Sequence, residues 1–280
     1  MSNICFLKKI LGRKSAKVMS ITGIIVATCI VAGTGLIIGL LLGFAGKAFE
    51  VEVDEKEIAI RECLPGNNCG GCGYAGCDAL AKAIANGEAP AGACPVGGMD
   101  VANEIAKIVG GTVEMTKNVA FVKCSGTCEK AGDRFEYYGN LDCNQAALST
   151  GGGPKSCAYG CMGFGSCVKV CEFDAIKVVD GIAVVDREKC VACGKCIKAC
   201  PKNLIELVPY EKKAFVACNS NDFGKDVKAV CQAGCIGCKI CEKNCEFDAI
   251  KVENNLAHVD YSKCTNCGKC KEKCPVKVIM

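Results

Sequence analysis

The sequence of 280 residues has 28 cysteines, no tryptophan and a formal net charge of +4. Its first 47 residues hold six of the 34 lysines and arginines and no acidic residue, and the other 28 basic residues face 30 acidic ones. Because most of the chain is not basic and aromatic side chains are scarce, the composition argues against nucleic-acid binding.

Cysteine is one residue in ten, a density typical of disulfide-stapled secreted scaffolds, but those are short chains. Here most cysteines lie in C-x-x-C runs, whose members are too close in sequence to staple distant parts of a fold. Such spacing suits several thiolates that bind one compact metal centre. Because thiolate sites of this kind persist in a reducing compartment, we expect the cysteine-rich part to face the cytoplasm.

The first expected element is a membrane-spanning helix over residues 18–46, where 29 consecutive residues carry no charge. That length crosses a hydrocarbon core of about 30 Å with some tilt, and it exceeds the apolar region of a signal peptide, about 7–15 residues. Gly35, Gly39 and Gly43 recur at every fourth position and share one helix face. We interpret this face as a packing site for another membrane helix, although glycine is common in such helices in any case.

The flanks of this helix give conflicting indications of its orientation. Five basic residues precede Val18, and the positive-inside rule would keep them in the cytoplasm and export everything after Lys47. Exported thiolate clusters would face oxidation, so we predict a single-pass cell-membrane protein whose cluster domains lie on the cytoplasmic side. A translation start at Met19 would remove the conflict and make residues 1–17 a basic upstream extension.

The stretch NCGGCGYAGC at residues 68–77 fits two kinds of site. Its letters GCGYAG match the G-x-G-x-x-G dinucleotide fingerprint, but that motif needs a strand before it and an acidic residue about 20 positions later. The preceding RECLPGNN is a poor strand, so we favour a cluster-binding loop followed by a short helix at DALAKAIANGE. Its glycines would let the backbone direct N–H groups at cluster sulfur atoms. The predicted ligands are Cys69, Cys72, Cys77 and Cys94.

The second half of the chain is an internal repeat. One copy, CEFDAIKVVDGIAVVDREKCVACGKCIKACPKNLI, begins at Cys171, and the other, CEFDAIKVENNLAHVDYSKCTNCGKCKEKCPVKVI, begins 74 residues later at Cys245. In each copy, apolar and other residues alternate on both sides of a turn, which lies at Asp180-Gly181 or at Asn254-Asn255. This pattern predicts a β-hairpin. Because such a unit has few apolar residues, a bound metal must supply much of its folding energy.

Each copy also contains the bacterial ferredoxin spacing C-x2-C-x2-C-x3-C-P, which begins at Cys190 and at Cys264. Three of its thiolates bind one [4Fe–4S] cluster and the fourth binds the other cluster of the pair. A zinc site would use two C-x-x-C pairs separated by a longer loop, so zinc is disfavoured.

The repeat predicts cluster ligands in groups of four. The regular groups are Cys235, Cys238, Cys241 and Cys274; Cys245, Cys264, Cys267 and Cys270; and Cys171, Cys190, Cys193 and Cys196.

The remaining group of the first copy is irregular, because Phe164 stands where the second copy has Cys238. Three ligands are left, namely Cys161, Cys167 and Cys200. We expect Cys157 to complete this group, and without it a three-iron cluster or a non-cysteine ligand would follow.

Further cysteines have no predicted group. They are Cys63, Cys124, Cys128, Cys143, Cys218 and Cys231. Two of them end a strand-like segment that also repeats, AFVKC and AFVAC, now 94 residues apart, so the first copy carries about twenty extra residues. Cys124, Cys128 and Cys143 are candidates for part of a sixth site, and the alternative is that they are buried free thiols. Cys5 and Cys29 are expected not to be ligands, and His258 is expected at the surface.

These elements predict an α+β protein with one transmembrane helix, a small cysteine-rich [4Fe–4S] domain and two ferredoxin-like bi-cluster modules. Five clusters are expected, and a sixth stays open. The expected segments are 1–17, a basic extension; 18–46, the transmembrane helix; 47–112, the [4Fe–4S] domain; 113–156, a connection with extra cysteines; 157–212, the first module; and 213–280, the second module.

Several motifs occur in a recognisable order: the membrane helix, FEVEVDEK, LPGNNCGGCGYAGC with CPVGG, KSCAYGCMGFGSC, and the paired ferredoxin runs. From Met19 onward the sequence resembles the B subunits of the Rnf complex, the ion-translocating ferredoxin:NAD⁺ oxidoreductase of bacterial membranes, in their long clostridial form. The resemblance implies that the chain takes electrons from soluble ferredoxin and passes them to partner subunits that carry flavin and bind NAD.

The residues themselves favour an electron relay with no complete active site on this chain alone. The sequence has no P-loop, no G-x-S-x-G and no S/T-G-A-T flavin-attachment motif. One alternative is a membrane-tethered polyferredoxin that serves another redox enzyme, such as a hydrogenase. The other is a non-redox interaction scaffold in which zinc or disulfides hold the cysteines.

Overall fold

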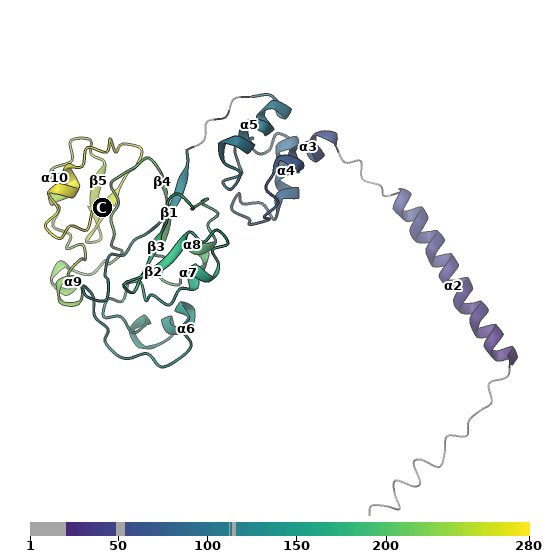
Figure 1. Ribbon diagram of the computed structural model, residues 1–280, viewed down its shortest axis with the longest axis horizontal. Coiled ribbons are helices and arrows are strands. Elements are labelled where there is room, and N and C mark those ends of the chain that lie inside the picture. The colour runs from purple at the N-terminus through teal and green to yellow at the C-terminus, as the bar shows by residue number, and fades with distance from the viewer. Residues whose placement is uncertain (1–20, 49–53, 112, 114–115) are drawn as a thin grey trace, which may run out of the picture. The chain divides into compact units, whose positions relative to one another are not determined.

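The computed structural model describes residues 21–48, 54–111, 113 and 116–280 (Figure 1). The chain divides into two units, residues 1–53 and residues 54–280. In the first unit only residues 21–48 are described. The extension predicted for residues 1–17, Met19 and the start of the predicted membrane span therefore lie outside the described residues.

Helix α2 (Ile21–Ala48) covers the described part of the predicted membrane span. Its segment Ile25–Gly46 has a mean hydropathy of 2.5, and none of the window is buried against the rest of the chain, so its length and composition make it a candidate membrane span. Thr34 donates its hydroxyl to the carbonyl oxygens of Ile30 and Val31, which satisfies this polar group inside the helix, as a lipid environment requires.

Residues 54–111 form a small domain of three helices. Helix α3 (Glu55–Cys63) begins at Asp54, whose carboxylate accepts the N–H of Lys56 at 2.9 Å. Helices α4 (Cys77–Ala85) and α5 (Gly98–Val109) each turn one apolar face towards it, and α4 is the helix predicted at DALAKAIANGE. The side chains that these faces bury include Ile60, Leu80, Ala81, Ile84 and Ile105.

Each copy of the repeat folds into the predicted β-hairpin. Strand β2 (Ile176–Val179) pairs with β3 (Ile182–Val185), and β5 (Ile250–Glu253) pairs with β6 (Leu256–Val259), both antiparallel and in the same register. His258 lies on β6 and is exposed, as expected from its place in the hairpin.

The two hairpins use the same turn. Asp180 and Gly181 have φ of 48° and 76°, and Asn254 and Asn255 have φ of 49° and 63°. A positive φ at both central residues is the signature of the type I′ turn, which Asp-Gly and Asn residues adopt readily. The turn prediction is therefore confirmed in both copies.

Short helices carry the cysteine runs that flank the hairpins. In the first copy these are α7 (Ser166–Lys169) and α8 (Lys195–Ala199), and in the second α10 (Ile240–Lys243) and α11 (Lys269–Glu272). The extra residues of the first copy add α6 (Cys143–Ala147) and the 3-10 turn η1 (Thr150–Gly152), and α9 (Gly224–Val230) precedes the second copy.

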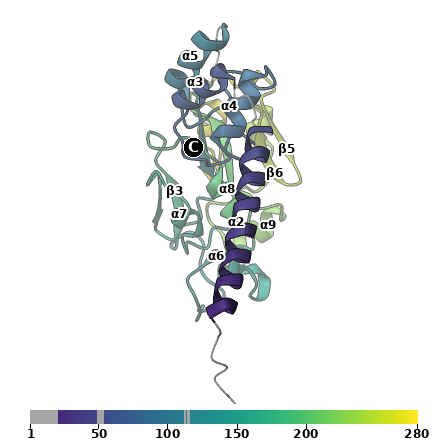
Figure 2. The ribbon, with the colours of Figure 1, turned by 90° about the vertical axis from the view of Figure 1, so that its right-hand side faces the viewer.

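The strand-like segments upstream of each copy differ in outcome. AFVKC contributes to β1 (Asn118–Val122), which pairs antiparallel with β4 (Ile205–Pro209). AFVAC forms no strand and makes one isolated bridge, between Val216 and Ile279. The described strands form three separate two-stranded sheets (Figures 1 and 2).

A small apolar core joins the two copies. Val119 and Val208, from the β1–β4 sheet, pack against Phe215, which leads into the second copy and is 4% exposed. The Phe215 ring centroid lies 5.0 Å from that of Phe121 and 5.9 Å from that of Tyr261. These contacts hold the two halves of the repeat region together.

We expect Phe215→Ala to destabilise this junction by about 3–5 kcal/mol, because it leaves a cavity in a packed aromatic core. Phe223→Ala is the matched control, since that ring is 71% exposed; its effect should stay within about 0.5 kcal/mol. Anaerobic urea denaturation of the iron-loaded chain, followed by visible absorbance, measures both. Equal midpoints for the two variants would contradict the role of this core.

Candidate iron–sulfur sites

Three of the four predicted cysteines of the small domain lie in or against one apolar core. Cys77 and Cys94 are buried in the domain core and Cys72 packs against it, while Cys69 is half-buried. Asn68 Oδ1 accepts the N–H of Cys77 at 2.7 Å and so closes the loop. The N–H of Gly97 points at Cys94 Sγ at 3.4 Å. Cys72, Cys77 and Cys94 therefore share one region of the domain, together with a backbone donor.

The same loop lacks the context of a dinucleotide site. Helix α3 and an irregular segment with positive φ at Gly66, Asn68 and Gly70 precede GCGYAG, and the described residues of this small domain contain no strand. A Rossmann loop needs a strand that ends at its first glycine. The structure thus supports the cluster-binding interpretation of residues 68–77.

In the repeat region, the cysteines of each regular group line one pocket. Each is lined by four cysteines, and the pockets measure about 330, 370 and 320 Å³ with their open mouths. In the same order, their cysteines are Cys171, Cys190, Cys193 and Cys196; Cys245, Cys264, Cys267 and Cys270; and Cys235, Cys238, Cys241 and Cys274. Because the three pockets have similar volumes and the same four thiol donors, they suit the same kind of metal centre.

The fourth cysteine beside the irregular group is Cys143, which the sequence analysis named with Cys124 and Cys128 as a candidate for part of a sixth site. A pocket of about 400 Å³ is lined by the three expected cysteines of this group and by Cys143. Asp142 caps α6 and accepts the hydroxyl of Ser166 at 2.9 Å, and the same hydroxyl accepts the N–H of Cys143 at 2.8 Å. These bonds fix the start of α6 against α7, which carries Cys167.

Cys157, which the sequence analysis placed in this group, lies elsewhere. It lines a separate pocket with three of the unassigned cysteines, Cys124, Cys218 and Cys231. The short link from Cys157 to Cys161 therefore joins two sites instead of serving one. Cys128 is exposed and lines none of the five pockets. Cys63 packs against the core of the small domain.

Three segments of the chain match models of iron–sulfur proteins. Residues 64–96 match a model described as a putative Fe-S cluster, residues 183–206 a 4Fe-4S binding domain and residues 234–278 a 4Fe-4S dicluster domain. The matches overlap the small domain and both copies of the repeat.

Longer comparisons identify the family. Over 92% of its length the chain is 48% identical to the B subunit of the Na(+)-translocating ferredoxin:NAD(+) oxidoreductase complex of Acetobacterium woodii, covering 78% of that protein. Over 89% of its length it is 43% identical to the B subunit of the ion-translocating oxidoreductase complex of Methanosarcina acetivorans, covering 95% of it. The chain belongs to this B-subunit family. Its counterpart in Clostridium ljungdahlii, from a complex named as proton-translocating, is 43% identical over 88% of both chains.

In this member of the B-subunit family, backbone N–H groups point at cysteine sulfur atoms in several of the sites. Ala183 donates to Cys161 Sγ at 3.4 Å, and Ala249 donates to Cys245 Sγ at 3.3 Å. A third such contact, of 3.3 Å, runs from Ala120 on β1 to Cys190 Sγ. Such donors orient thiolate ligands and raise the reduction potential of a bound iron–sulfur cluster.

The thiols of these pockets are costly to ionise unless a cation is bound. Burial, with added repulsion from neighbouring thiols, raises the pKa of Cys167 and of Cys196 to about 12. The same causes raise the pKa of Cys241 to about 11. Bound iron would replace these protons, so the donor sets fit a metal guest whose binding is coupled to folding.

The spacing of the donors also bears on zinc. Among the described residues, no three His, Cys, Asp or Glu side chains lie close enough together to hold a single metal ion. A four-iron cluster binds each thiolate to a different iron, so its ligands stand further apart than those of one ion. The pockets therefore fit a cluster better than a lone zinc ion.

We expect the chain without iron to lose hydrogen-exchange protection in the β2–β3 and β5–β6 hairpins, because their cores depend on metal-bound cysteines. Anaerobic reconstitution with iron and sulfide should restore the protection. Reconstitution with zinc alone is the control and should not restore it. Hairpins that stay protected in the iron-free chain would contradict the coupling.

Proposed function

We propose that this chain is the electron-relay subunit of a membrane-bound, ion-translocating ferredoxin:NAD⁺ oxidoreductase. It would accept electrons from soluble ferredoxin and deliver them to flavin-bearing partner subunits. The relatives described above are all named as subunits of ion-translocating oxidoreductase complexes, which supports this role over a free-standing polyferredoxin.

We propose five four-cysteine groups as cluster ligands: the group of the small domain, the three regular groups of the repeat, and the irregular group with Cys143 in the place expected for Cys157. When bound there, [4Fe–4S] clusters supply one-electron carriers. The chain's own contribution is to hold them in fixed positions, to limit their contact with water and to direct N–H groups at their ligands.

The observation that carries the proposal is that successive groups are neighbours. Burial raises the pKa of Cys167, and Cys196 of the adjacent group is close enough to add to that effect. Burial likewise raises the pKa of Cys193, with a contribution from Cys69 of the small domain. A Cβ on Gly71 would lie 2.8 Å from the carbonyl oxygen of Cys193, so the two cysteine loops are in backbone contact. Redox centres that lie side by side in this way make a relay.

The second module offers the entry point for a soluble donor. Cys238 and Cys267 are exposed, in contrast to the cysteines of the first module, all of which are buried or half-buried. Lys271 and Lys273 are exposed beside them on and after α11. This combination suits docking of an acidic electron carrier such as ferredoxin.

Helix α2 would anchor the protein in the cell membrane, with the cluster domains on the cytoplasmic side. Its Gly35, Gly39 and Gly43 lie on an open face, since a Cβ added at any of them would meet no atom within 4 Å apart from the neighbouring backbone of the helix itself. This face is available for close approach by a helix of a partner subunit.

Replacing Cys143 tests the relay. Cys143→Ala should lower the iron content by about four atoms per chain, one cluster's worth, and should reduce ferredoxin-dependent NAD⁺ reduction by membranes at least about tenfold, since a broken relay passes few electrons. Cys128→Ala removes a thiol that lines none of the pockets and should change neither value. The proposal fails if membranes with Cys143→Ala keep full activity, or if the purified complex holds zinc without acid-labile sulfide.

A further inference from the structure

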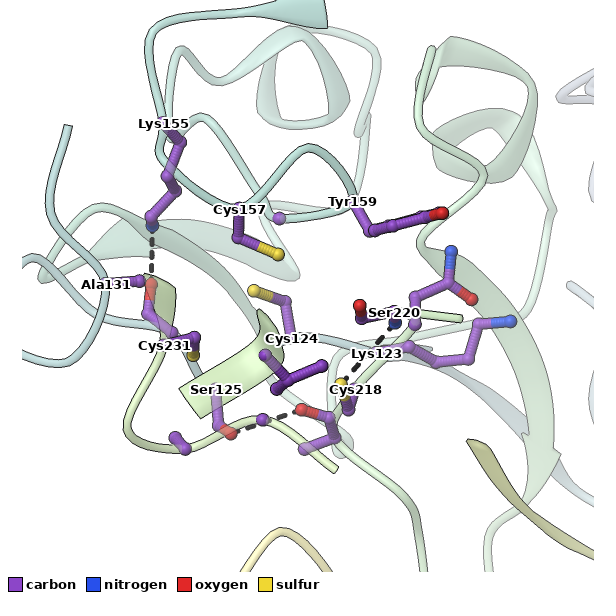
Figure 3. Close-up of a pocket in the computed structure, with 17 residues that line it drawn as sticks. Lys123, Cys124, Ser125, Ala131, Lys155, Cys157, Tyr159, Cys218, Ser220 and Cys231 are labelled. Carbon is purple, nitrogen blue, oxygen red and sulfur yellow. Dashed lines mark hydrogen bonds between the residues drawn. The ribbon is translucent and has the colours of Figure 1, made fainter. Parts of the chain in front are cut away.

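One pocket of the repeat region is lined by four cysteines that belong to none of the five groups (Figure 3). It measures about 370 Å³, and its cysteines are Cys124, Cys157, Cys218 and Cys231. Figure 3 shows the side chains of Cys124 and Cys157 pointing towards one another. A Cβ on Gly126 would lie 3.4 Å from Cys231 Sγ and 3.7 Å from Cys124 Sγ, so these two sulfur atoms also converge.

We propose that these four cysteines hold a further [4Fe–4S] cluster, which lies between the two copies of the repeat and connects their modules. This inference rests on the proposed relay function and extends it. The donor set and the size of the pocket match those of the four pockets assigned above.

The four cysteines are two pairs related by the repeat. Cys124 and Cys218 end the two AFV-x-C segments, 94 residues apart, and Cys157 and Cys231 are 74 residues apart, the offset of the ferredoxin motifs. Each copy thus supplies one cysteine from its upstream segment and one from its C-x3-C run. Neither copy alone can complete the site, which explains why its ligands do not appear as a motif within one module.

Backbone groups tie this site to a neighbouring group on each side. The N–H of Cys161 donates to Cys124 Sγ at 3.4 Å. The N–H of Cys235 makes the corresponding hydrogen bond to Cys218. Cys161 and Cys235 are proposed ligands of the adjacent clusters in the first and the second copy. Direct contacts between ligands of neighbouring clusters are a short route for electrons.

A buried ammonium group provides independent support. Lys155 is 5% exposed and lines the pocket. Its Nζ donates to the carbonyl oxygens of Gly126 and Cys161. Among the described residues no carboxylate forms an ion pair with it. A buried charge without a counter-ion is costly. Four thiolates on a four-iron cluster carry net negative charge and would supply the missing anion.

The redox step at this site is simple to balance. One electron moves between two neighbouring iron–sulfur clusters, one of which is oxidised while the other is reduced, and no covalent bond forms or breaks. The proposed cluster accepts one electron from the neighbouring cluster of one module and passes it to that of the other, so no additional reactant is needed.

Iron and acid-labile sulfide per chain, measured on the anaerobically purified complex, test the site. The unaltered chain should hold about 24 iron atoms, whereas five clusters would give about 20. Cys124→Ala and Cys231→Ala should each remove about four iron and four sulfide. Their combination should also remove about four, because both residues serve one cluster, whereas Cys143→Ala with Cys231→Ala should remove about eight.

Other outcomes are equally decisive. About 20 iron atoms in the unaltered chain, with no loss in Cys124→Ala or Cys231→Ala, would overturn this site and leave the five-cluster relay standing. A loss of about eight in the Cys124→Ala/Cys231→Ala variant would assign the two residues to separate sites and overturn it as well. If the variants fail to fold, the count in the unaltered chain still decides. Iron without sulfide would instead contradict the proposed function.

Lys155→Met provides a second readout that does not depend on loss of iron. Removing a positive charge between two clusters should shift the reduction potential of at least one of them to more negative values while the iron content stays unchanged. Lys228→Met, at an exposed position on α9, is the control and should leave all potentials unchanged. Unchanged potentials in Lys155→Met would overturn the assignment of Lys155 as the counter-charge of a cluster in this pocket.

Discussion

Sulfur–iron bonding is the interaction on which the repeat region depends. The buried cores of the two modules combine a few aliphatic side chains with cysteines. In the first module Ile176, Ile182 and Leu204 share one buried core with Cys167 and Cys196. Domains with so little apolar surface are marginally stable without a metal. The same cysteines are costly to ionise when buried side by side. Folding of the modules and binding of the clusters are therefore coupled, and we expect neither to be complete without the other.

The departure of the first copy from the repeat has a structural explanation. Phe164 replaces the cysteine of the second copy, and its ring lies 5.4 Å, centroid to centroid, from Tyr137 in the inserted segment. The residue that removes one thiol thus anchors the insertion that brings in Cys143. Asp142 and Ser166 then fix the start of α6 next to α7. In the proposed assignment, the fourth ligand comes from a separate segment instead of the cysteine run, and the group of four is kept.

Features that depend on local spacing could be predicted from the sequence, whereas ligand positions that depend on tertiary contacts could not. The C-x2-C-x2-C-x3-C runs, and turns such as Asp180-Gly181, depend on neighbours in the chain, and the structure has both as expected. Cys143 lies 18 residues before Cys161, and only the tertiary contacts of α6 bring it there. Cys157 was the nearer candidate by spacing, but its side chain belongs to the next pocket. The signal for that pocket was present in the sequence, since its four cysteines form two pairs at the two repeat offsets.

Ligand symmetry does not make the two modules equivalent electrostatically. Lys155 contacts the carbonyl oxygen of Cys161, on the side of the first module, and the residue that corresponds to it in the second copy is Ala229. A buried positive charge stabilises the reduced form of a nearby cluster more than the oxidised form. With clusters bound as proposed, this asymmetry raises potentials on the side of the first module. Electrons that enter at the second module, as proposed, would then be favoured to move towards the first.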